Sequence, residues 1–493
     1  MKLMLINSPN KSSGHNTNYA LFPPIGIIQL GTRIKQDYAD KVDVNILDGG
    51  LSTTGSIMAE IDRYHPDVVG IGVLTPTYAE GLKIAQHAKK GGAKVILGDD
   101  HAIFFPELIL KNRPEIDYIV ANDVAEGPFS QLIRALLYQR SLDKVSSRVY
   151  RADSGIQANP STPYFLKDQN TVPDLALISN TLGTYAQNYN EAFGHLKSKQ
   201  IKPVTINNAR GCENLNRCTY CSIADLMINT GNPKQFWDTV RSYHENFGIN
   251  LFFEVYDSFT ASPKYIDGLV TSLPKDLENL IAQGDIELMV YARALGLLKR
   301  DNIGKLYKIG VRAVNIGLDA GDTTILEAQR KNKTTLETNL DAISLLSQRG
   351  IIIHASFIAG ALGETTESLE TTISHIESIA KASKFSAIEF SRFIPLPNSP
   401  AWDLLVDFED PKFYKSPDEI KLELAIRGIS IPPHIRDQLK DQYKEADLLD
   451  IEELASDWFA HFTHIDENYA VERINDVNET LSSFNIRTGK NVG

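Results

Sequence analysis

The stretch NNARGCENLNRCTYCSI, residues 207–223, contains all three cysteines of the 493-residue chain. Cys212, Cys218 and Cys221 have the spacing C-x5-C-x2-C, which puts three thiols on one short loop. Three thiolates that converge on one point can hold an iron–sulfur cluster or a metal ion. A [4Fe-4S] cluster with only three protein ligands leaves one iron open to a non-protein ligand. The odd number of cysteines also argues against a disulfide framework.

The cysteine stretch follows the first of six apolar segments that alternate with helical patterns in the barrel region, residues 201–400. The spacing leaves room for a crossover helix after each strand, as a parallel sheet requires. Six such units are fewer than the eight of a closed barrel, so we predict a partial (β/α)6 barrel with the cysteines on its catalytic face. Strands are expected over residues 204–207, 251–256, 286–291, 313–318, 351–358 and 387–393.

Residues 1–140 show a second alternating α/β pattern. Continuous apolar runs such as VVGIGVL are typical of strands covered on both faces. We therefore predict a doubly wound, Rossmann-like domain that binds its ligand beyond the carboxyl ends of the strands. Strands are expected over 3–7, 42–47, 68–73, 94–97 and 118–120, and helices over 25–35, 55–64, 78–89 and 127–138.

Two further regions complete the predicted organisation. Residues 141–200 read as a linker that includes a hairpin with Asp153-Ser154-Gly155 at its turn. Residues 401–493 are mainly helical in pattern and are predicted to form a small helical C-terminal region.

The composition is that of an ordinary globular protein, with 42% hydrophobic and 23% charged residues. Fifty lysines and arginines against 62 acidic residues give a formal net charge of −12, so we expect no nucleic-acid partner. No segment approaches the roughly 18 apolar residues of a membrane span. The opening MKLMLINSPN lacks the apolar run of a secretory leader. These features predict a cytoplasmic protein without a membrane partner.

The cysteine loop and the six-unit barrel resemble the radical S-adenosylmethionine (SAM) enzymes. That family typically has C-x3-C-x2-C after the first strand, with an aromatic residue before the last cysteine, and Tyr220 occupies the aromatic position. The resemblance implies that the open iron binds SAM and that one electron cleaves it to methionine and a 5′-deoxyadenosyl radical. The chain departs from the family by two extra residues in the segment ENLNR, between the first two cysteines.

Other barrel segments resemble the same family in the same order along the chain. NIGLDAGD resembles the fourth-strand segment whose acid, here Asp319, contacts SAM. FIAGALGET resembles the loop whose glycine, here Gly360, lets the backbone approach the cofactor. VYDSFTASP contributes Asp257 at the end of the second strand, and Arg293 ends the third. For each, the alternative is ordinary turn chemistry or a solvated surface charge.

The N-terminal domain resembles the cobalamin-binding domain that precedes the barrel in one large class of radical SAM enzymes. The segments LFPPIGIIQL, LTPTYAEGLKIA, ILGDDHAIFFP and DYIVANDVAEGPFSQLI carry the likeness. It implies that the turn Thr75, Pro76, Thr77 and the turn from Gly98 to His101 contact cobalamin. The family usually has Gly-Gly-x-His where this chain has Gly-Asp-Asp-His, and no D-x-H-x-x-G run provides a histidine ligand for cobalt. The alternative is a domain with a purely architectural role.

The resemblance implies an enzyme that uses a [4Fe-4S] cluster, SAM and cobalamin to transfer a methyl group to an unactivated carbon or phosphorus centre of a small molecule. An external one-electron reductant such as flavodoxin or ferredoxin would be its partner. One alternative is a cyclase or rearrangement enzyme that uses the same cofactors without methyl transfer. Another is a non-catalytic cobalamin- or zinc-binding protein, with zinc held by the cysteines and by His195 or another residue. Methylthiolation of tRNA is disfavoured because no cysteines remain for a second cluster.

Overall fold

The computed structural model describes residues 1–10, 20–161, 172–194, 199–331, 333–383 and 385–488. The chain divides into two compact units, each made of several segments. Unit 1 comprises Met1–Thr205, Ser242–Ile249 and Ala446–Leu449. Unit 2 comprises Ile206–Arg241, Asn250–Glu445 and Asp450–Gly493.

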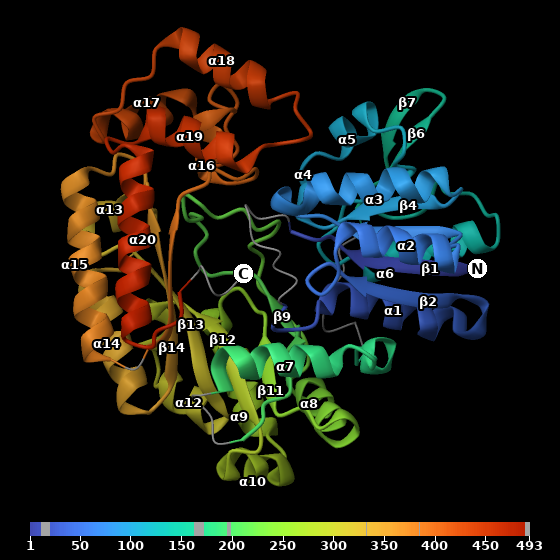
Figure 1. Cartoon of the computed structure of the whole chain (residues 1–493), viewed down its shortest axis with the longest axis horizontal. Helices are drawn as coiled ribbons and strands as arrows, with labels where there is room; N and C mark the ends of the chain where they lie inside the picture. The colour runs from blue at the N-terminus through green and yellow to red at the C-terminus, as the bar shows by residue number, and fades with distance from the viewer. Residues whose placement is uncertain (11–19, 162–171, 195–198, 332, 384, 489–493) are drawn as a thin grey trace. The chain divides into compact units, whose positions relative to one another are not determined.

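Unit 1 contains a seven-stranded sheet in the order β2-β1-β3-β4-β5-β6-β7 (Figure 1). β1 to β5 pair in parallel, and β6 and β7 add in antiparallel fashion. Alternate residues of β1 enter two cores, Met4 and Ile6 one of them and Leu3 and Leu5 the other, so the sheet is covered on both faces as predicted. The strands are β1 (Lys2–Asn7), β2 (Asp43–Asp48), β3 (Val68–Gly72), β4 (Lys94–Gly98), β5 (Tyr118–Val120), β6 (Arg148–Ala152) and β7 (Gly155–Ala158). The helices are α1 (Ile25–Tyr38), α2 (Thr54–Tyr64), α3 (Tyr78–Lys90), α4 (Asp100–Phe104), α5 (Pro106–Asn112), α6 (Glu126–Leu137) and α7 (Leu182–Phe193).

Unit 1 extends through the region that we expected to be a linker. The expected hairpin forms, but its strands β6 and β7 continue the sheet beyond β5. Helix α7 is tied to the same unit, because the Tyr185 hydroxyl donates to Asp48 Oδ2 at 2.6 Å at the end of β2. The short helices α4 and α5, which meet at Phe105 and Pro106, were not predicted.

The predicted partial barrel is a six-stranded sheet in the sequential order β15-β14-β13-β12-β11-β8 (Figure 1). Its strands β11 to β15 belong to unit 2, which begins at Ile206, the last residue of β8. The neighbours from β11 to β15 pair in parallel. Capping side chains of Asp322, Thr335 and Thr365 begin the helices α13, α14 and α15. The strands are β8 (Pro203–Ile206), β9 (Ala209–Arg210), β10 (Asn229–Thr230), β11 (Leu251–Glu254), β12 (Glu287–Ala292), β13 (Val311–Asp319), β14 (Ile352–Ala359) and β15 (Phe385–Arg392). The helices are α8 (Pro233–Phe247), which belongs to unit 2 only as far as Arg241, α9 (Pro263–Ser272), α10 (Lys275–Gln283), α11 (Ala294–Leu297), α12 (Asn302–Lys308), α13 (Thr323–Ala328), α14 (Leu336–Gln348) and α15 (Thr366–Ala382).

The C-terminal region is helical, as predicted, and belongs to unit 2 apart from Ala446–Leu449. The Trp458 ring stacks on Phe393 and on Phe462, with centroids 4.6 Å apart in both pairs, which ties α19 to the segment after β15. Across the described ranges, the helices are too short or too polar to cross a bilayer. The helices are α16 (Pro400–Leu405), α17 (Pro417–Ile426), α18 (Pro433–Tyr443), α19 (Ile451–Phe462) and α20 (Glu467–Ser483).

Candidate active site

The cysteine loop leaves the carboxyl end of β8, and the antiparallel pair β9 and β10 closes its base. Gly211, directly before the first cysteine, has φ of +97°, and a Cβ there would lie 2.3 Å from the Met227 carbonyl oxygen. Glycine is therefore required where the two ends of the loop meet. Gly211 N donates to Asp257 Oδ2 at 2.7 Å, and Cys212 N donates to the Leu226 carbonyl at 3.2 Å. These bonds fix the position of the first cysteine.

The three thiols are free and partly exposed. Asn214 bonds to two of them: its backbone N–H donates to Cys212 Sγ at 3.5 Å, and its side-chain amide donates to Cys218 Sγ at 3.1 Å. Burial raises the pKa of Cys212 to about 12 and that of Cys221 to about 11. Both are neutral thiols at pH 7 unless a cation or a cluster binds and takes up the thiolates. Amide donors to sulfur ligands are typical of iron–sulfur sites, so this loop fits a [4Fe-4S] cluster.

A tight turn accommodates the two extra residues of the cysteine loop. Arg217 N donates to the Asn214 carbonyl at 2.9 Å, and Arg217 has φ of +53°. Leu215 is 79% exposed, so the added chain projects into solvent. The Arg217 guanidinium donates to the carbonyl oxygens of Ile223 at 2.6 Å and Asn398 at 3.1 Å. The cysteine loop therefore remains bound at its end, to the carbonyl groups of Ile223 and Asn398, despite the two extra residues.

The described residues form no mononuclear metal site. Within these ranges, no three His, Cys, Asp or Glu side chains lie close enough to hold one metal ion. A zinc ion needs such a group, with ligand atoms at ~2.0–2.3 Å from the metal. A [4Fe-4S] cluster instead binds each cysteine on a different iron. His195, the fourth ligand in the zinc alternative, lies outside the described residues.

Tyr220 and Asp319, both predicted as cofactor ligands, are in contact. The Tyr220 hydroxyl donates to Asp319 Oδ1 at 3.1 Å. Asp319 is 1% exposed and pairs with Lys331, whose ammonium also donates to the Gly317 carbonyl. Sequence reasoning missed Lys331 because it lies on a loop after α13 and no motif marks it. A ligand that binds Asp319 has to share it with these two partners or displace one of them.

Buried polar groups without partners gather after β11 and β12. In the described part of the chain, Tyr256 Oη, Ser258 Oγ, Thr260 Oγ1 and Arg293 Nε have no hydrogen-bond partner. A buried polar group without a partner costs about 1–3 kcal/mol, so such a group of atoms is typical of a place that a polar ligand completes. The amino-acid and ribose groups of SAM would supply matching donors and acceptors.

Glu254, on β11, is a buried acid that sequence reasoning also missed. Its Oε1 accepts from Asn208 N at 2.9 Å and from Ala209 N at 3.2 Å. Burial raises its pKa to about 8, so the side chain is mainly protonated at pH 7. Glu254 therefore supports the backbone that leads into the cysteine loop.

Gly360 lies where the loop after β14 meets helix α19. It has φ of +93°, and a Cβ there would lie 2.3 Å from the Phe459 ring. The Gly360 carbonyl accepts from Trp458 Nε1 at 2.7 Å, and Gly360 N donates to Glu364. Packing against α19 is therefore a sufficient reason for this glycine. The approach of a cofactor at Gly360 stays a prediction.

The residues predicted to contact cobalamin lie at the carboxyl edge of the unit 1 sheet. Thr75–Thr77 form one 3-10 turn after β3, in which Leu74 N donates to Thr77 Oγ1 at 2.9 Å. His101, in α4 after β4, is fully buried. Its Nδ1 pairs with Thr75 Oγ1 at 3.1 Å, and its Nε2 pairs with the Asp447 carbonyl at 2.8 Å. The structure thus brings Thr75 and His101 together through contacts inside unit 1.

The same edge has features that fit a bound macrocycle. Gly98 leaves open space, because a Cβ there would meet only the Val120 carbonyl, at 3.9 Å. Leu74 is 43% exposed, and in the described ranges the buried Ser8 Oγ has no partner. The exposed apolar side chain of Leu74, directly before the Thr75–Thr77 turn, suits the face of a corrin. His101 is less suited to contact it, because burial lowers its pKa to about 4 and both of its ring nitrogens are engaged.

Comparison with protein families matches residues 206–376 to the radical SAM superfamily. An uncharacterized methyltransferase of Pyrococcus horikoshii is 24% identical over 416 residues, which cover 82% of this chain and 83% of the relative. The anaerobic magnesium-protoporphyrin IX monomethyl ester cyclase of Rubrivivax gelatinosus is 27% identical over 386 residues, which cover 76% of this chain and 65% of the cyclase.

Two solved structures share the fold. The radical SAM methyltransferase TsrM of Kitasatospora setae, with cobalamin and a [4Fe-4S] cluster bound, aligns with a TM-score of 0.64 at 15% identity and covers 97% of this chain and 99% of that one. The cobalamin-dependent radical SAM enzyme OxsB, with aqua-cobalamin and SAM bound, aligns with a TM-score of 0.63 at 14% identity and covers 98% of this chain and 79% of that one. The likeness spans both units and the C-terminal helices.

Proposed function

Because this chain is a radical SAM enzyme with the fold of the cobalamin-dependent members, we propose that it transfers a methyl group to an unactivated carbon or phosphorus centre of a small molecule. The observation that carries the proposal is the cysteine loop, whose three partly exposed thiols and Asn214 amide lie at the carboxyl end of the first barrel strand. The methyl-transfer assignment is supported by the methyltransferase names of TsrM, whose fold the chain shares, and of the Pyrococcus horikoshii relative.

Each part of the site has its own task in this proposal. Cys212, Cys218 and Cys221 would hold the [4Fe-4S] cluster, with Asn214 donating to the sulfurs. When bound, the cluster supplies the electron that cleaves SAM, and cobalamin supplies the methyl carrier. The Tyr220 hydroxyl holds Asp319 in place for the SAM ribose or amino-acid group. Arg293 Nε is available to the SAM carboxylate, while Arg293 Nη2 donates to the Lys331 carbonyl at 2.7 Å.

The chain depends on an outside electron donor. All three cysteines lie in one loop, so the chain has no cysteines for a second cluster that would relay electrons. A flavodoxin or a ferredoxin has the one-electron chemistry that this role needs.

Anaerobic reconstitution with iron, sulfide and hydroxocobalamin, followed by incubation with SAM and a chemical reductant, tests the proposal. We expect 5′-deoxyadenosine, and replacing any one of the three cysteines with alanine should lower its formation by at least a hundredfold, since an incomplete ligand set loses the cluster. Ser222→Ala, one residue beyond the loop's last cysteine, is the matched control and should retain the cluster absorbance. Stoichiometric zinc without acid-labile sulfide would contradict the proposal.

A cyclase or rearrangement activity is the second candidate, because the Rubrivivax gelatinosus relative is a cyclase. The same assay separates the two reactions by their products. Methyl transfer that consumes SAM twice yields S-adenosylhomocysteine together with 5′-deoxyadenosine, whereas ring formation yields 5′-deoxyadenosine alone. A candidate substrate that gains no methyl group, with no S-adenosylhomocysteine formed, would favour the cyclase.

A further inference from the structure

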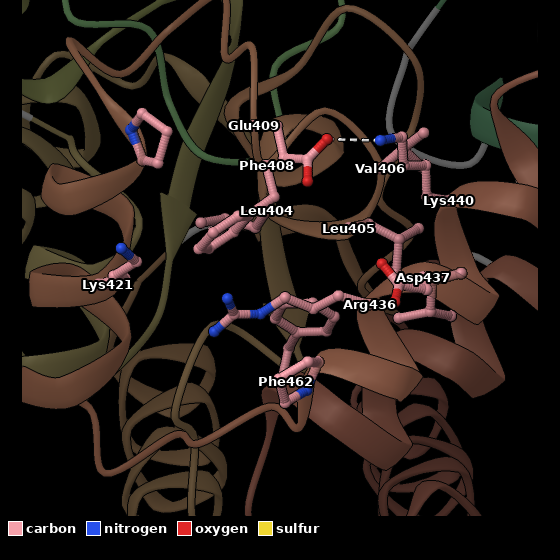
Figure 2. Close-up of a pocket in the computed structure, with 13 residues that line it drawn as sticks. Leu404, Leu405, Val406, Phe408, Glu409, Lys421, Arg436, Asp437, Lys440 and Phe462 are labelled. Atoms are coloured by element: carbon pink, nitrogen blue, oxygen red, sulfur yellow. Dashed lines mark hydrogen bonds and ion pairs between the residues drawn. The ribbon is translucent and has the colours of Figure 1, made fainter.

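The C-terminal helices line an open cavity of about 310 Å3, a volume at the lower end of the range of small-molecule sites (Figure 2). Its lining comes from α16, α17, α18, the end of α19 and the segment after α16, and all of these lining residues belong to unit 2. The cavity shares no lining residue with the cysteine loop or with Asp319. Its apolar wall is formed by Leu404, Leu405, Val406, Leu439 and Phe462, which are each at most 3% exposed.

Two of the three cations that line the cavity are already neutralised. Lys440 pairs with Glu409 at 2.5 Å, the dashed contact in Figure 2. Lys421 pairs with Asp418 at 2.8 Å on the same helix. Each ammonium group therefore already has a carboxylate partner.

Arg436 is the cation that the protein does not neutralise. Its guanidinium has no hydrogen bond or ion pair among the described residues, and its buried Nε is without a partner. The guanidinium lies over the Phe408 ring, 3.9 Å from the centroid. Figure 2 shows it apart from the Glu409–Lys440 contact. The aromatic ring holds the guanidinium plane in position while its N–H groups stay available.

We propose that this cavity binds a small carboxylate with an aliphatic body, whose carboxylate pairs with Arg436. A guanidinium matches a carboxylate through two parallel N–H···O bonds, and the apolar wall covers the chain. A single uncompensated cation favours a monoanion. Asp437, on the same lining, would repel a dianion such as phosphate more strongly than a monoanion. The site is independent of the reaction proposed above.

Calorimetric titration of the full-length chain with decanoate tests this assignment. We expect wild type to bind decanoate and Arg436→Gln to bind it roughly tenfold to a hundredfold more weakly, as the loss of a charged hydrogen-bond pair predicts. Lys234→Gln on α8 removes an equal charge from an exposed position outside the cavity, so its affinity should equal that of wild type. 1-Decanol should bind as weakly as decanoate binds Arg436→Gln, and inorganic phosphate should give no binding heat.

The conservative variant Arg436→Lys covers the case in which Arg436→Gln does not fold. It keeps the charge without the planar fork, so it should bind decanoate less tightly than wild type and still prefer decanoate to 1-decanol. Absence of decanoate binding to folded wild type would overturn the proposal. Equal affinity of wild type for decanoate and 1-decanol, or of wild type and Arg436→Gln for decanoate, would overturn it as well.

Discussion

At Asp99 the backbone takes a conformation that glycine adopts more easily than any other residue. Its φ and ψ are +73° and 174°, a region that costs a non-glycine residue about 1–3 kcal/mol. The related family usually has glycine at this place. The aspartate offsets part of this cost, because its Oδ1 accepts from Asp100 N at 2.9 Å and caps α4.

We therefore expect Asp99→Gly to stabilise the protein by about 1 kcal/mol, since relief of strain exceeds the few tenths lost with the cap. The measurement is the midpoint of thermal unfolding by circular dichroism, which should rise. Asp100→Gly, at an ordinary helical position in α4, is the control. It should lower the unfolding midpoint, because glycine in a helix destabilises the protein by about 1 kcal/mol. A lower midpoint for Asp99→Gly would show that the carboxylate matters more than the strain.

At the scale of elements, the sequence predicted well where a single periodicity governs a segment. The parallel strands of both sheets could be placed because continuous apolar runs mark strands with two buried faces. The helices α4 and α5 were missed because each is shorter than two helical turns, too short to show a period. The cysteines, Tyr220 and Asp319 could each be anticipated from motifs, but the hydrogen bond between Tyr220 and Asp319 was not predicted. Lys331 could not, because only the folded chain brings it to Asp319.

The loop after β14 and helix α19 fit together only if residue 360 has no side chain. Gly360→Ala should destabilise the protein by about 2–3 kcal/mol, because the new Cβ would overlap the Phe459 ring and alanine disfavours a φ of +93°. Thermal unfolding of the purified variant measures the loss. Adding Phe459→Leu should recover part of the lost stability, because it removes the overlap with the ring. The cost of placing alanine at a φ of +93° would remain.

Gly98→Ala is the comparison for this element. Its Cβ would have no neighbour closer than 3.9 Å, and its backbone is not in the left-handed region. It should unfold within about 0.5 kcal/mol of wild type. Equal losses at residues 98 and 360 would mean that packing against α19 does not explain the glycine.

On the scale of the whole molecule, the chain returns to unit 1 late in the sequence through Ala446–Leu449. Asp447 joins this segment to unit 1: its carboxylate accepts from Tyr78 at 2.8 Å, Asn112 at 2.9 Å and Arg113 Nε at 2.6 Å. Its carbonyl accepts from His101 at 2.8 Å. No local pattern around residue 447 could indicate partners more than 300 positions earlier, and so the predicted division at residue 401 did not include this segment.

Asp447→Asn should destabilise the protein by about 2 kcal/mol at pH 7, because Arg113 loses its partly buried counterion. Burial alone would raise the pKa of Asp447, but the bonds from Arg113, Asn112 and Tyr78 outweigh it and lower the pKa. A carboxyl with a lowered folded-state pKa adds stability above its unfolded pKa, near 4, and loses it as the pH falls through the folded value. The difference in the free energy of unfolding between wild type and Asp447→Asn, measured by urea unfolding, should therefore become smaller below pH ~4. A difference that stayed constant down to pH ~2 would show that the substitution destabilises the protein through the shape of the side chain and not through the lost negative charge.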